Sequence, residues 1–382
     1  MRSPNNDSKR VVMLLSNPFR PDPRVLKEAR TLTEAGYRVY ILCWDRQGEY
    51  PEHEQIDGII VRRFNIKSVY SAGSKQMLYL PRFWLRAFKE MSILIPDIVH
   101  CHDLDTTIPG YLYALMHRVP WIYDAHECYP EQIRPQVHQI IYRTLVQLEK
   151  FISPRASHLI TVGRLLANHF QSFGARTSIV GNYPDLISYQ TNPHHINQQH
   201  LNIPSSELII AYIGGFTQAR EILPLIVSSS LVPDVTVLLA GDGPQRPIIE
   251  AAIPHYPKVR YLGWIPQELV PAYTSLADVI YYGLNISDGN STYSSPNALF
   301  NAMAAGKPIL TTDVGEVAQI VKERNCGLVI TRATPELIAS AIVQFKDATL
   351  RDHMASNASN AAITAYNWGE ARGKLLSIYR QL

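Results

Sequence analysis

Residues 294–308 read SSPNALFNAMAAGKP and predict a short helix with both of its ends marked in the sequence. Ser294 or Ser295 can cap the first turn, and Pro296 suits the first helical position. Gly306 and then Pro308 end the helix, because glycine adopts the left-handed conformation at a helix end and proline cannot continue the hydrogen bonding. The segment therefore predicts a helix that begins just after the two serines.

Buried strands are predicted on both sides of this helix, at residues 277–282 (ADVIYY) and 309–312 (ILTT). Leu299, Phe300 and Met303 fall on one helix face, which is expected to pack inward. A helix between two parallel strands begins at the carboxyl edge of the sheet, where open α/β sheets bind ligands. Its N–H groups and dipole favour an anion such as a pyrophosphate.

Strand and helix patterns alternate along the whole chain, which predicts βαβ units. Strands are expected at residues 11–15, 38–42, 96–103, 121–127, 158–162 and 177–180, and then at 208–213, 235–240, 259–266 and 327–330. A chain of 382 residues suits two domains, and the segment from about Asp185 to Ser206 is polar and aperiodic, as in a linker. We predict one Rossmann-like domain over residues 1–185, a linker over 186–206 and a second Rossmann-like domain over 207–366.

The composition is that of a globular chain, with 46% hydrophobic and 18% charged residues. The net charge of +3 is too small to indicate a nucleic-acid partner. The four cysteines, Cys43, Cys101, Cys128 and Cys326, lack metal-type spacing and suit a reducing compartment. Residues 1–10 carry no signal-peptide core, and no apolar run approaches the length of a membrane span, so we expect a cytoplasmic protein.

Residues 294–308 resemble the donor-site signature of the family 4, GT-B-fold, retaining glycosyltransferases. Further resemblances are the run from Asp22 to Ala29, the two strands that end in histidine and acid near His102 and His126, and the last helix from Asn367. The resemblance covers nearly the whole chain. It implies an α/β protein of the GT-B type, with two Rossmann-like domains facing a central cleft and the helix 367–382 packing back on the first domain.

The same resemblance implies which residues form the site. His126 would be catalytic, and the acceptor-side residues would be Asp22, Arg24, His102, Asp103 and Glu127. The donor-binding residues would be Gly214, Gly215, Phe216, Thr217, Arg220, Gly243, Trp264, Ile265, Ser294, Ser295, Pro296, Asn297 and Asn301. Glycines after a strand let a ligand approach backbone N–H groups, although an ordinary tight turn is the alternative for Gly214 and Gly215. No metal or cofactor is expected: the histidines and acids lack a fixed ligand spacing, and the resembling family needs no metal.

Three positions depart from the family pattern. Ala298 stands where relatives carry a lysine, and Tyr293 and Asn301 stand where they carry a pair of glutamates. Glu221 also replaces a usual glycine after Arg220. We expect an enzyme that transfers a sugar, with retention, from a UDP- or GDP-type donor to an unidentified acceptor. The alternatives are a nucleotide- or sugar-binding pseudoenzyme that assists a partner glycosyltransferase and, on fold analogy alone, an epimerase.

The segment from Lys75 to Met91 predicts an amphipathic helix. Its apolar stripe comprises Leu80, Trp84, Phe88 and Met91, and its basic face comprises Arg82, Arg86 and Lys89. We prefer the interpretation that the stripe packs on the sheet and the charges are solvated. The alternative is a peripheral contact with the inner face of an anionic membrane.

Overall fold

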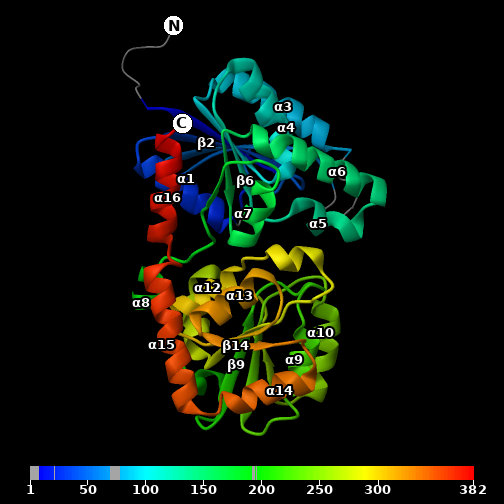
Figure 1. Cartoon of the computed structure of the whole chain (residues 1–382), viewed down its shortest axis with the longest axis vertical. Helices are drawn as coiled ribbons and strands as arrows, with labels where there is room; N and C mark the ends of the chain where they lie inside the picture. Colours follow the sequence, from blue (N-terminus) through cyan, green and yellow to red (C-terminus); the bar gives the residue numbers. More distant parts are fainter. Residues whose placement is uncertain (1–7, 21, 69–77, 192–193, 195) are drawn as a thin grey trace. The chain divides into compact units, whose positions relative to one another are not determined.

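The computed structural model describes residues 8–20, 22–68, 78–191, 194 and 196–382, and it divides into two compact units (Figure 1). Unit 1 comprises residues 1–180 together with 372–382, and unit 2 comprises residues 181–371. Residues 75–77 of the predicted amphipathic segment lie outside the described residues.

Unit 1 contains, within the described residues, an eight-stranded sheet of order β3-β4-β2-β1-β5-β6-β7-β8. The strands are β1 (Arg10–Leu15), β2 (Arg38–Asp45), β3 (His53–Ile56), β4 (Ile59–Asn65), β5 (Ile98–His102), β6 (Trp121–Ala125), β7 (His158–Thr161) and β8 (Thr177–Ile179). All neighbours pair in parallel except β3 and β4. Helices cover both faces, so a central strand such as β1 is buried on both sides and is almost wholly apolar.

The helices of unit 1 are α1 (Pro23–Glu34), α3 (Leu80–Leu94), α4 (Leu104–His117), α5 (Tyr129–Ile133), α6 (Gln139–Ile152) and α7 (Arg164–Gln171), joined by most of α16 (Trp368–Arg380). Helix α4 packs against both α3 and α6. Helix α16 lies beside α1, where Arg372 pairs with Glu34 at 3.0 Å (Figure 1). Tyr379 of α16 is buried in unit 1.

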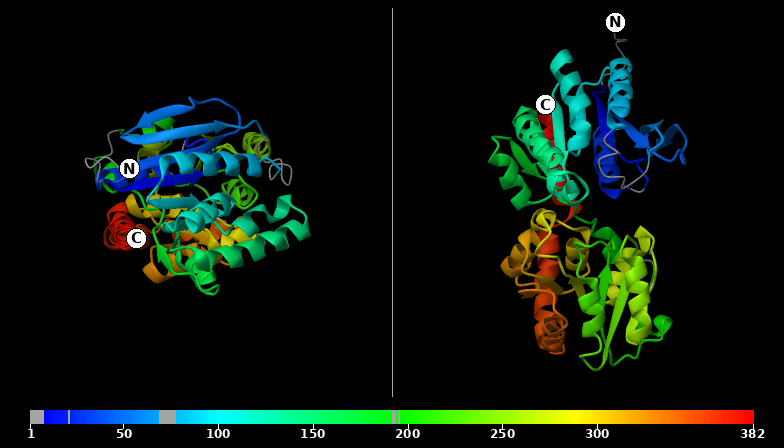
Figure 2. Two further views of the ribbon diagram at one scale, coloured as in Figure 1. Left: turned by 90° about the horizontal axis from the view of Figure 1, so that it is seen from above. Right: turned by 90° about the vertical axis from the view of Figure 1, so that its right-hand side faces the viewer.

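Unit 2 contains, within the described residues, a six-stranded parallel sheet of order β11-β10-β9-β12-β13-β14. The strands are β9 (Leu208–Ile213), β10 (Val235–Ala240), β11 (Val259–Tyr261), β12 (Val279–Tyr282), β13 (Ile309–Thr312) and β14 (Gly327–Ile330). The helices are α8 (Ile187–Thr191), α9 (Ile222–Ser228), α10 (Arg246–Ala252), α11 (Val270–Leu276), α12 (Asn297–Ala304), α13 (Gly315–Arg324), α14 (Pro335–Gln344) and α15 (Ala348–Thr364). Helix α9 packs with α10 and α14, while α12 packs with α11 and α15 on the opposite face of the sheet (Figure 2).

The predicted helix over residues 294–308 is α12, and its predicted flanking strands are β12 and β13. Two backbone hydrogen bonds close the C-terminal end of α12. The N–H of Gly306 donates to Met303 O (3.0 Å), and the N–H of Lys307 donates to Ala302 O (2.8 Å). Gly306 has φ of +63°, which glycine adopts without strain. The prediction of the start was wrong by one residue: Pro296 is itself the cap, with an extended backbone, and the helix begins at Asn297.

The predicted apolar stripe of α3 was partly wrong. Leu80 and Met91 are buried as expected, but Phe83 and Ala87 complete the buried face. Trp84 and Phe88 are half-buried and point toward α4, where the indole N–H of Trp84 donates to Asp105 O at 2.7 Å. The helix has two packing partners, the sheet and α4, so a single stripe did not describe its buried surface.

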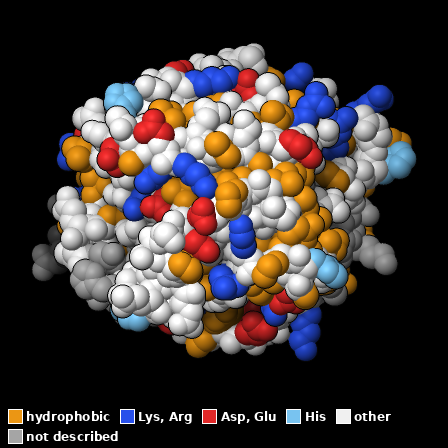
Figure 3. All heavy atoms as spheres, turned by 90° about the horizontal axis from the view of Figure 1, so that it is seen from below, with side chains coloured by type: hydrophobic (Ala, Val, Ile, Leu, Met, Phe, Trp, Pro, Cys, Tyr) orange, Lys and Arg blue, Asp and Glu red, His pale blue; other side chains and the backbone are white. Residues whose placement is uncertain are grey.

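The region predicted as a linker contains α8 and a short 3₁₀ helix at Gln198–Leu201. The division between the units falls between Val180 and Gly181. Acidic, basic and apolar side chains are interspersed on the face of the molecule that Figure 3 shows, in keeping with the small net charge of +3.

Candidate active site

The order in which successive strands are added to the sheet of unit 2 reverses between β9 and β12. From β9 the chain moves outward to β10 and β11, and then it returns to β12 on the other side of β9 and continues to β13 and β14. Ligands of open α/β sheets bind outside the carboxyl ends of the strands at such a switch point. The loops that follow β9 and β12 are therefore the first place to look for a site in unit 2.

Arg220 lies at this switch point. Its backbone forms a bridge with Leu284, which follows β12, and its guanidinium stacks over the ring of Tyr282 at 4.8 Å from the ring centre. The bridge holds Arg220 in the loop, and α9 begins only at Ile222. Arg220 is therefore held in the loop at the carboxyl edge of the sheet, where its charge can meet an anion.

The glycine loop after β9 is shaped by close backbone contacts. The N–H of Gly214 donates to Ala240 O (2.9 Å), and the hydroxyl of Tyr212 donates to Gly215 O (2.7 Å). A Cβ on Gly243 would lie 2.6 Å from the carbonyl oxygen of Phe216, so only glycine fits there. Gly243 therefore lets the loops after β9 and β10 approach each other.

Two apolar residues predicted to bind the donor, Phe216 and Ile265, have buried side chains. Phe216 is fully buried against the rings of Tyr212 and Tyr261, and its N–H donates to Asp242 O at 2.8 Å. Ile265 is also buried, whereas the neighbouring Trp264 is 66% exposed. The side chains of Phe216 and Ile265 thus pack inside the loops and support them. The exposed side chains of Thr217 and Trp264 are available to a ligand.

The start of α12 brings the remaining donor-side residues to the carboxyl ends of β12 and β13. Ser294 and Ser295 are buried, Pro296 and Asn301 are half-buried, and Asn297 is exposed. Helix α12 has eight residues, and its N–H groups at the first turn are directed toward this edge. Burial raises the pKa of Glu221, which follows Arg220 in the chain.

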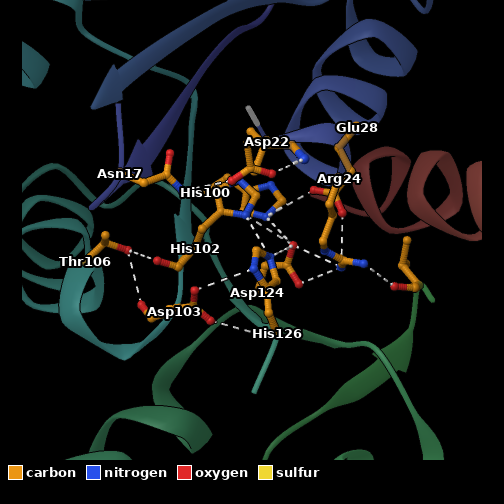
Figure 4. Close-up of polar contacts among 12 residues, drawn as sticks. Asn17, Asp22, Arg24, Glu28, His100, His102, Asp103, Thr106, Asp124 and His126 are labelled. Atoms are coloured by element: carbon orange, nitrogen blue, oxygen red, sulfur yellow. Dashed lines mark hydrogen bonds and ion pairs between the residues drawn. The ribbon is translucent and has the colours of Figure 1, made fainter. Parts of the chain in front are cut away.

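In unit 1 the order in which successive strands are added to the sheet reverses between β1 and β5. A buried ionic cluster lies at the ends of the strands there (Figure 4). Arg24 of α1 donates to both oxygens of Asp124 at 2.9 and 3.1 Å and pairs with Glu28 at 3.0 Å. A third carboxylate, that of Asp103, lies in the loop after β5. Asp103 Oδ1 accepts a hydrogen bond from the backbone N–H of His126 at 3.1 Å. We call Arg24, Glu28, His100, His102, Asp103, Asp124 and His126 the ionic cluster.

His126 faces two carboxylates. Its Nε2 lies 3.2 Å from Asp124 Oδ2, and its Nδ1 lies 3.5 Å from Asp103 Oδ2. Burial alone would lower the pKa of His126, but Asp103 and Asp124 outweigh burial and raise it to about 9. His126 is therefore an imidazolium at neutral pH, a hydrogen-bond donor rather than a general base.

The other members of the cluster have unequal charges. Burial would raise the pKa of Asp124, but Arg24 and His126 hold it well below its usual range. Burial raises the pKa of Glu28 to about 8 and lowers the pKa of His102 well below its usual value. The cluster at neutral pH thus contains a fixed carboxylate, Asp124, held between two cations.

The structure brings together Arg24, His102, Asp103 and His126 of the predicted residues, and it places Asp22 at the start of α1, where Asp22 Oδ1 accepts from the N–H of Val25 at 3.1 Å. Glu127 follows His126 and is half-buried. The sequence reasoning missed Asp124 and Glu28 as site residues. An acid within an otherwise apolar strand, as Asp124 is near the end of β6, was the available signal, because a buried carboxylate requires partners.

His100 is fully buried, and its Nδ1 lies 2.6 Å from the hydroxyl of Tyr379 on α16. Ring stacking joins it to His102 at 4.4 Å between centres. The last helix of the chain thereby contacts the back of the ionic cluster.

Two groups of side chains, among the described residues, place metal-ligand atoms within 4.8 Å of one another: Glu28, His100, His102 and Asp124, and separately Cys128, Glu149 and His169. The first group is part of the ionic cluster, where Arg24 already supplies a positive charge to both carboxylates. In the second group, the ion pair that the structure describes joins Glu149 to His169, and neither arginine nor lysine takes part in it.

The elevated pKa of His126 predicts a pH-dependent stability. Because the folded pKa (about 9) exceeds the ordinary value of 6.5, the stabilisation is complete below pH 6.5 and is lost as pH rises through 9. The free energy of unfolding in urea should therefore fall between these values in the wild type and fall less in His126→Gln. His53→Gln, at an exposed histidine of β3, is the control that should keep the wild-type slope. Equal slopes in wild type and His126→Gln would contradict the assignment.

The comparisons with known proteins agree with this architecture. Residues 24–186 match the family described as Glycosyltransferase Family 4, and residues 208–347 match the family described as Glycosyl transferases group 1. An uncharacterized glycosyltransferase of Methanocaldococcus jannaschii is 21% identical over 354 residues, which is 87% of each chain.

Solved structures share the fold over nearly the whole chain. Sucrose-phosphate synthase of Thermosynechococcus elongatus superposes with a TM-score of 0.82 at 19% identity and covers 98% of this chain and 99% of its own. HepE of Anabaena, solved with UDP-glucose, superposes with a TM-score of 0.74 at 16% identity and covers 97% of this chain and 100% of its own. The fold is therefore GT-B, and the predicted fold class is confirmed. The matches of both units, together with this fold, support a glycosyltransferase of group 1.

Proposed function

We propose that the chain is a retaining, metal-independent glycosyltransferase of family 4 whose unit 2 binds the nucleotide-sugar donor. The observation that carries the proposal is the position of Arg220, stacked on Tyr282 at the point where the strand order in the sheet of unit 2 reverses. A fixed guanidinium at this edge is suited to a diphosphate, since arginine offers several donors in a planar arrangement.

Three features would stabilise the leaving diphosphate. Arg220 supplies a charge, the loop at Gly214 and Gly215 brings backbone close to the ligand, and the start of α12 adds N–H groups and a favourable dipole. Breaking the bond to the sugar places negative charge on the diphosphate, and the protein must stabilise it when no metal does. Retention would follow if the acceptor attacks from the face that the diphosphate leaves.

In unit 1, His126 is the proposed catalytic residue. Its imidazolium, held by Asp103 and Asp124, can donate a hydrogen bond to a sugar hydroxyl or to an oxygen that becomes negative. Asp103 and His126 are the members of the ionic cluster with the most exposed side chains, 32% and 18%. They are the groups through which the cluster would meet a substrate, and Asp22, Arg24, His102 and Glu127 would shape the acceptor side around them.

The donor is proposed to be a UDP- or GDP-sugar. HepE was solved with UDP and with UDP-glucose, which makes UDP-sugars the first to test. The replacement of the paired glutamates by Tyr293 and Asn301 weakens the contact with ribose without removing it, because an asparagine oxygen still accepts a hydrogen bond. The relatives do not favour the alternative of a pseudoenzyme.

A panel of UDP- and GDP-sugars tests the proposal. The purified chain should hydrolyse or transfer from at least one donor, and its calorimetric affinity for that donor should be equal or higher in Asn301→Glu, because a carboxylate can accept bonds from two ribose hydroxyls. Asn360→Glu adds the same charge on an exposed face of α15 and should leave the affinity unchanged. Donor binding without any turnover would favour the pseudoenzyme, and the absence of binding by every donor would contradict the proposal.

We further propose that the protein is cytoplasmic and contacts the inner face of the membrane through α3. Leu85 and Ile93 of α3 are 73% and 60% exposed, and exposed Arg82, Arg86 and Lys89 lie among them. Anionic lipids attract such a surface. Among the residues that the structure describes, none of the helices has both the length and the apolar character needed to cross a membrane.

Binding to anionic vesicles should be sensitive to salt and should weaken when Arg82, Arg86 and Lys89 are all changed to Gln. The control removes the same charge from unit 2, by changing Arg246, Arg260 and Lys346 to Gln. If the two triple variants sediment with vesicles to the same extent, α3 serves only to pack against the sheet and α4.

A further inference from the structure

Three side chains with metal-binding atoms meet in unit 1 away from the ionic cluster. Cys128 precedes α5, Glu149 belongs to α6 and His169 belongs to α7. His169 Nε2 lies 3.5 Å from Glu149 Oε2 and 4.0 Å from Cys128 Sγ, and the three ligand atoms lie within 4.8 Å of one another. Three separate elements thus direct sulfur, nitrogen and oxygen to one point.

The surroundings of Glu149 keep one of its oxygens directed at this point. The hydroxyl of Tyr123, in β6, donates to Glu149 Oε1 at 3.3 Å, which leaves Oε2 to face the histidine. Glu149 is 2% exposed, and a buried carboxylate needs a positive partner. The partner described for it is His169, which is positive only when it is protonated.

We propose that Cys128, Glu149 and His169 form a binding site for a zinc-like divalent cation. Thiolate, imidazole and carboxylate are the zinc ligands of proteins, and three of them leave a fourth position for water. Metal–ligand bonds of ~2.0–2.3 Å in a tetrahedron put the ligand atoms roughly 3.3–3.6 Å apart. The distance between Glu149 Oε2 and His169 Nε2, 3.5 Å, already has this value. Cys128 Sγ, at 4.0 Å from His169 Nε2, must move only slightly closer to it.

Access and supporting contacts also suit a metal. Cys128 and Glu149 are buried, but the side chain of His169 is 23% exposed, which provides an entry from solvent. Tyr123 orients the carboxylate from outside the ligand set, as outer contacts do in metal sites. On binding, the thiol of Cys128 loses its proton to solvent and its sulfur bonds to the cation.

The site would brace the loop that carries the candidate catalytic residue. Cys128 lies two positions after His126, in the same loop between β6 and α5. A cation bound there ties this loop to α6 and α7 at a point outside the ionic cluster. The site does not depend on the proposed sugar transfer, since its ligands take no part in donor binding.

The test titrates the metal-free, full-length chain with Co²⁺, which replaces Zn²⁺ and gives a near-ultraviolet charge-transfer band when a thiolate binds it. We expect one equivalent of Co²⁺, a thiolate band, and loss of the band when Zn²⁺ is added. Cys128→Ser should lack the band. Cys326→Ser, which changes a buried cysteine of unit 2, should retain it.

Two variants keep the test decisive if Cys128→Ser does not fold. Tyr123→Phe keeps every ligand and the ring volume, and it should weaken Co²⁺ binding by roughly 10–100-fold. His169→Gln changes a partly exposed ligand and should weaken it at least as much. Co²⁺ binding without a thiolate band would place the metal in the ionic cluster instead and overturn the proposal, as would wild-type affinity in Tyr123→Phe and His169→Gln.

Discussion

Arg220→Ala is expected to weaken nucleotide-sugar binding by about 1.5–3 kcal/mol, or roughly 10–150-fold in Kd, because it removes a charged hydrogen-bond partner of the diphosphate. The effect should be large because the guanidinium is held in place before the ligand arrives. Its stacking over Tyr282 and the backbone bridge to Leu284 fix it at the edge of the sheet. Calorimetric titration with the best donor of the panel measures the change.

Arg324→Ala is the matched control. Arg324 is also an arginine of unit 2 that stacks over a tyrosine ring, at 5.4 Å from the centre of Tyr366. It lies at the end of α13, next to the amino ends of the strands, so its loss should not change donor affinity. Clear wild-type binding with the same Kd in Arg220→Ala would show that the diphosphate binds elsewhere.

Asp124→Asn is expected to destabilise unit 1 by about 3–5 kcal/mol, because it removes the carboxylate that accepts both hydrogen bonds from the buried cation Arg24 and leaves only Glu28 beside it. Asparagine has nearly the same shape, so the loss reports charge rather than packing. The pKa of His126 should fall in the variant as well, since Asp124 is one of the two carboxylates that raise it. Urea unfolding followed by tryptophan fluorescence is suitable, because Trp44, Trp84 and Trp121 all lie in unit 1.

Asp57→Asn provides the comparison on the surface. Asp57 pairs with Arg30 at 2.6 Å, but both side chains are 49% exposed, and such pairs contribute about 0–1 kcal/mol. Its left-handed backbone, with φ of +51°, is one that asparagine tolerates. If the two variants lose the same stability, the buried charges of the ionic cluster do not support the fold in the way we infer.

Local signals explain why most of the fold could be predicted. Strand β9 has the predicted bounds, because a parallel strand buried on both faces is a continuous apolar run. The end of α12 could also be predicted, because the residue that ends the helix, Gly306, belongs to the segment itself. The start of α12 was misplaced by one residue, since proline can act either as the cap or as the first helical residue.

The parts that the sequence did not reveal depend on distant pairs. Arg24 on α1 and Asp124 on β6 are 100 positions apart, and they meet because β1, which precedes α1, pairs with β5, which in turn pairs with β6. The bridge between Arg220 and Leu284 is likewise a contact across the sheet edge. Phe216 and Ile265 illustrate the opposite case: their place in a motif suggested ligand contact, whereas burial gives their side chains a packing role.

The bond between Tyr379 and His100 has a consequence for how the chain matures during synthesis. The two residues are 279 positions apart, and all of unit 2 is translated between them. Domains generally fold as units while the ribosome proceeds from the N-terminus. Unit 1 must therefore wait until α16 has been synthesised before His100 gains its hydroxyl partner, so unit 2 can complete its core while unit 1 is still unfinished.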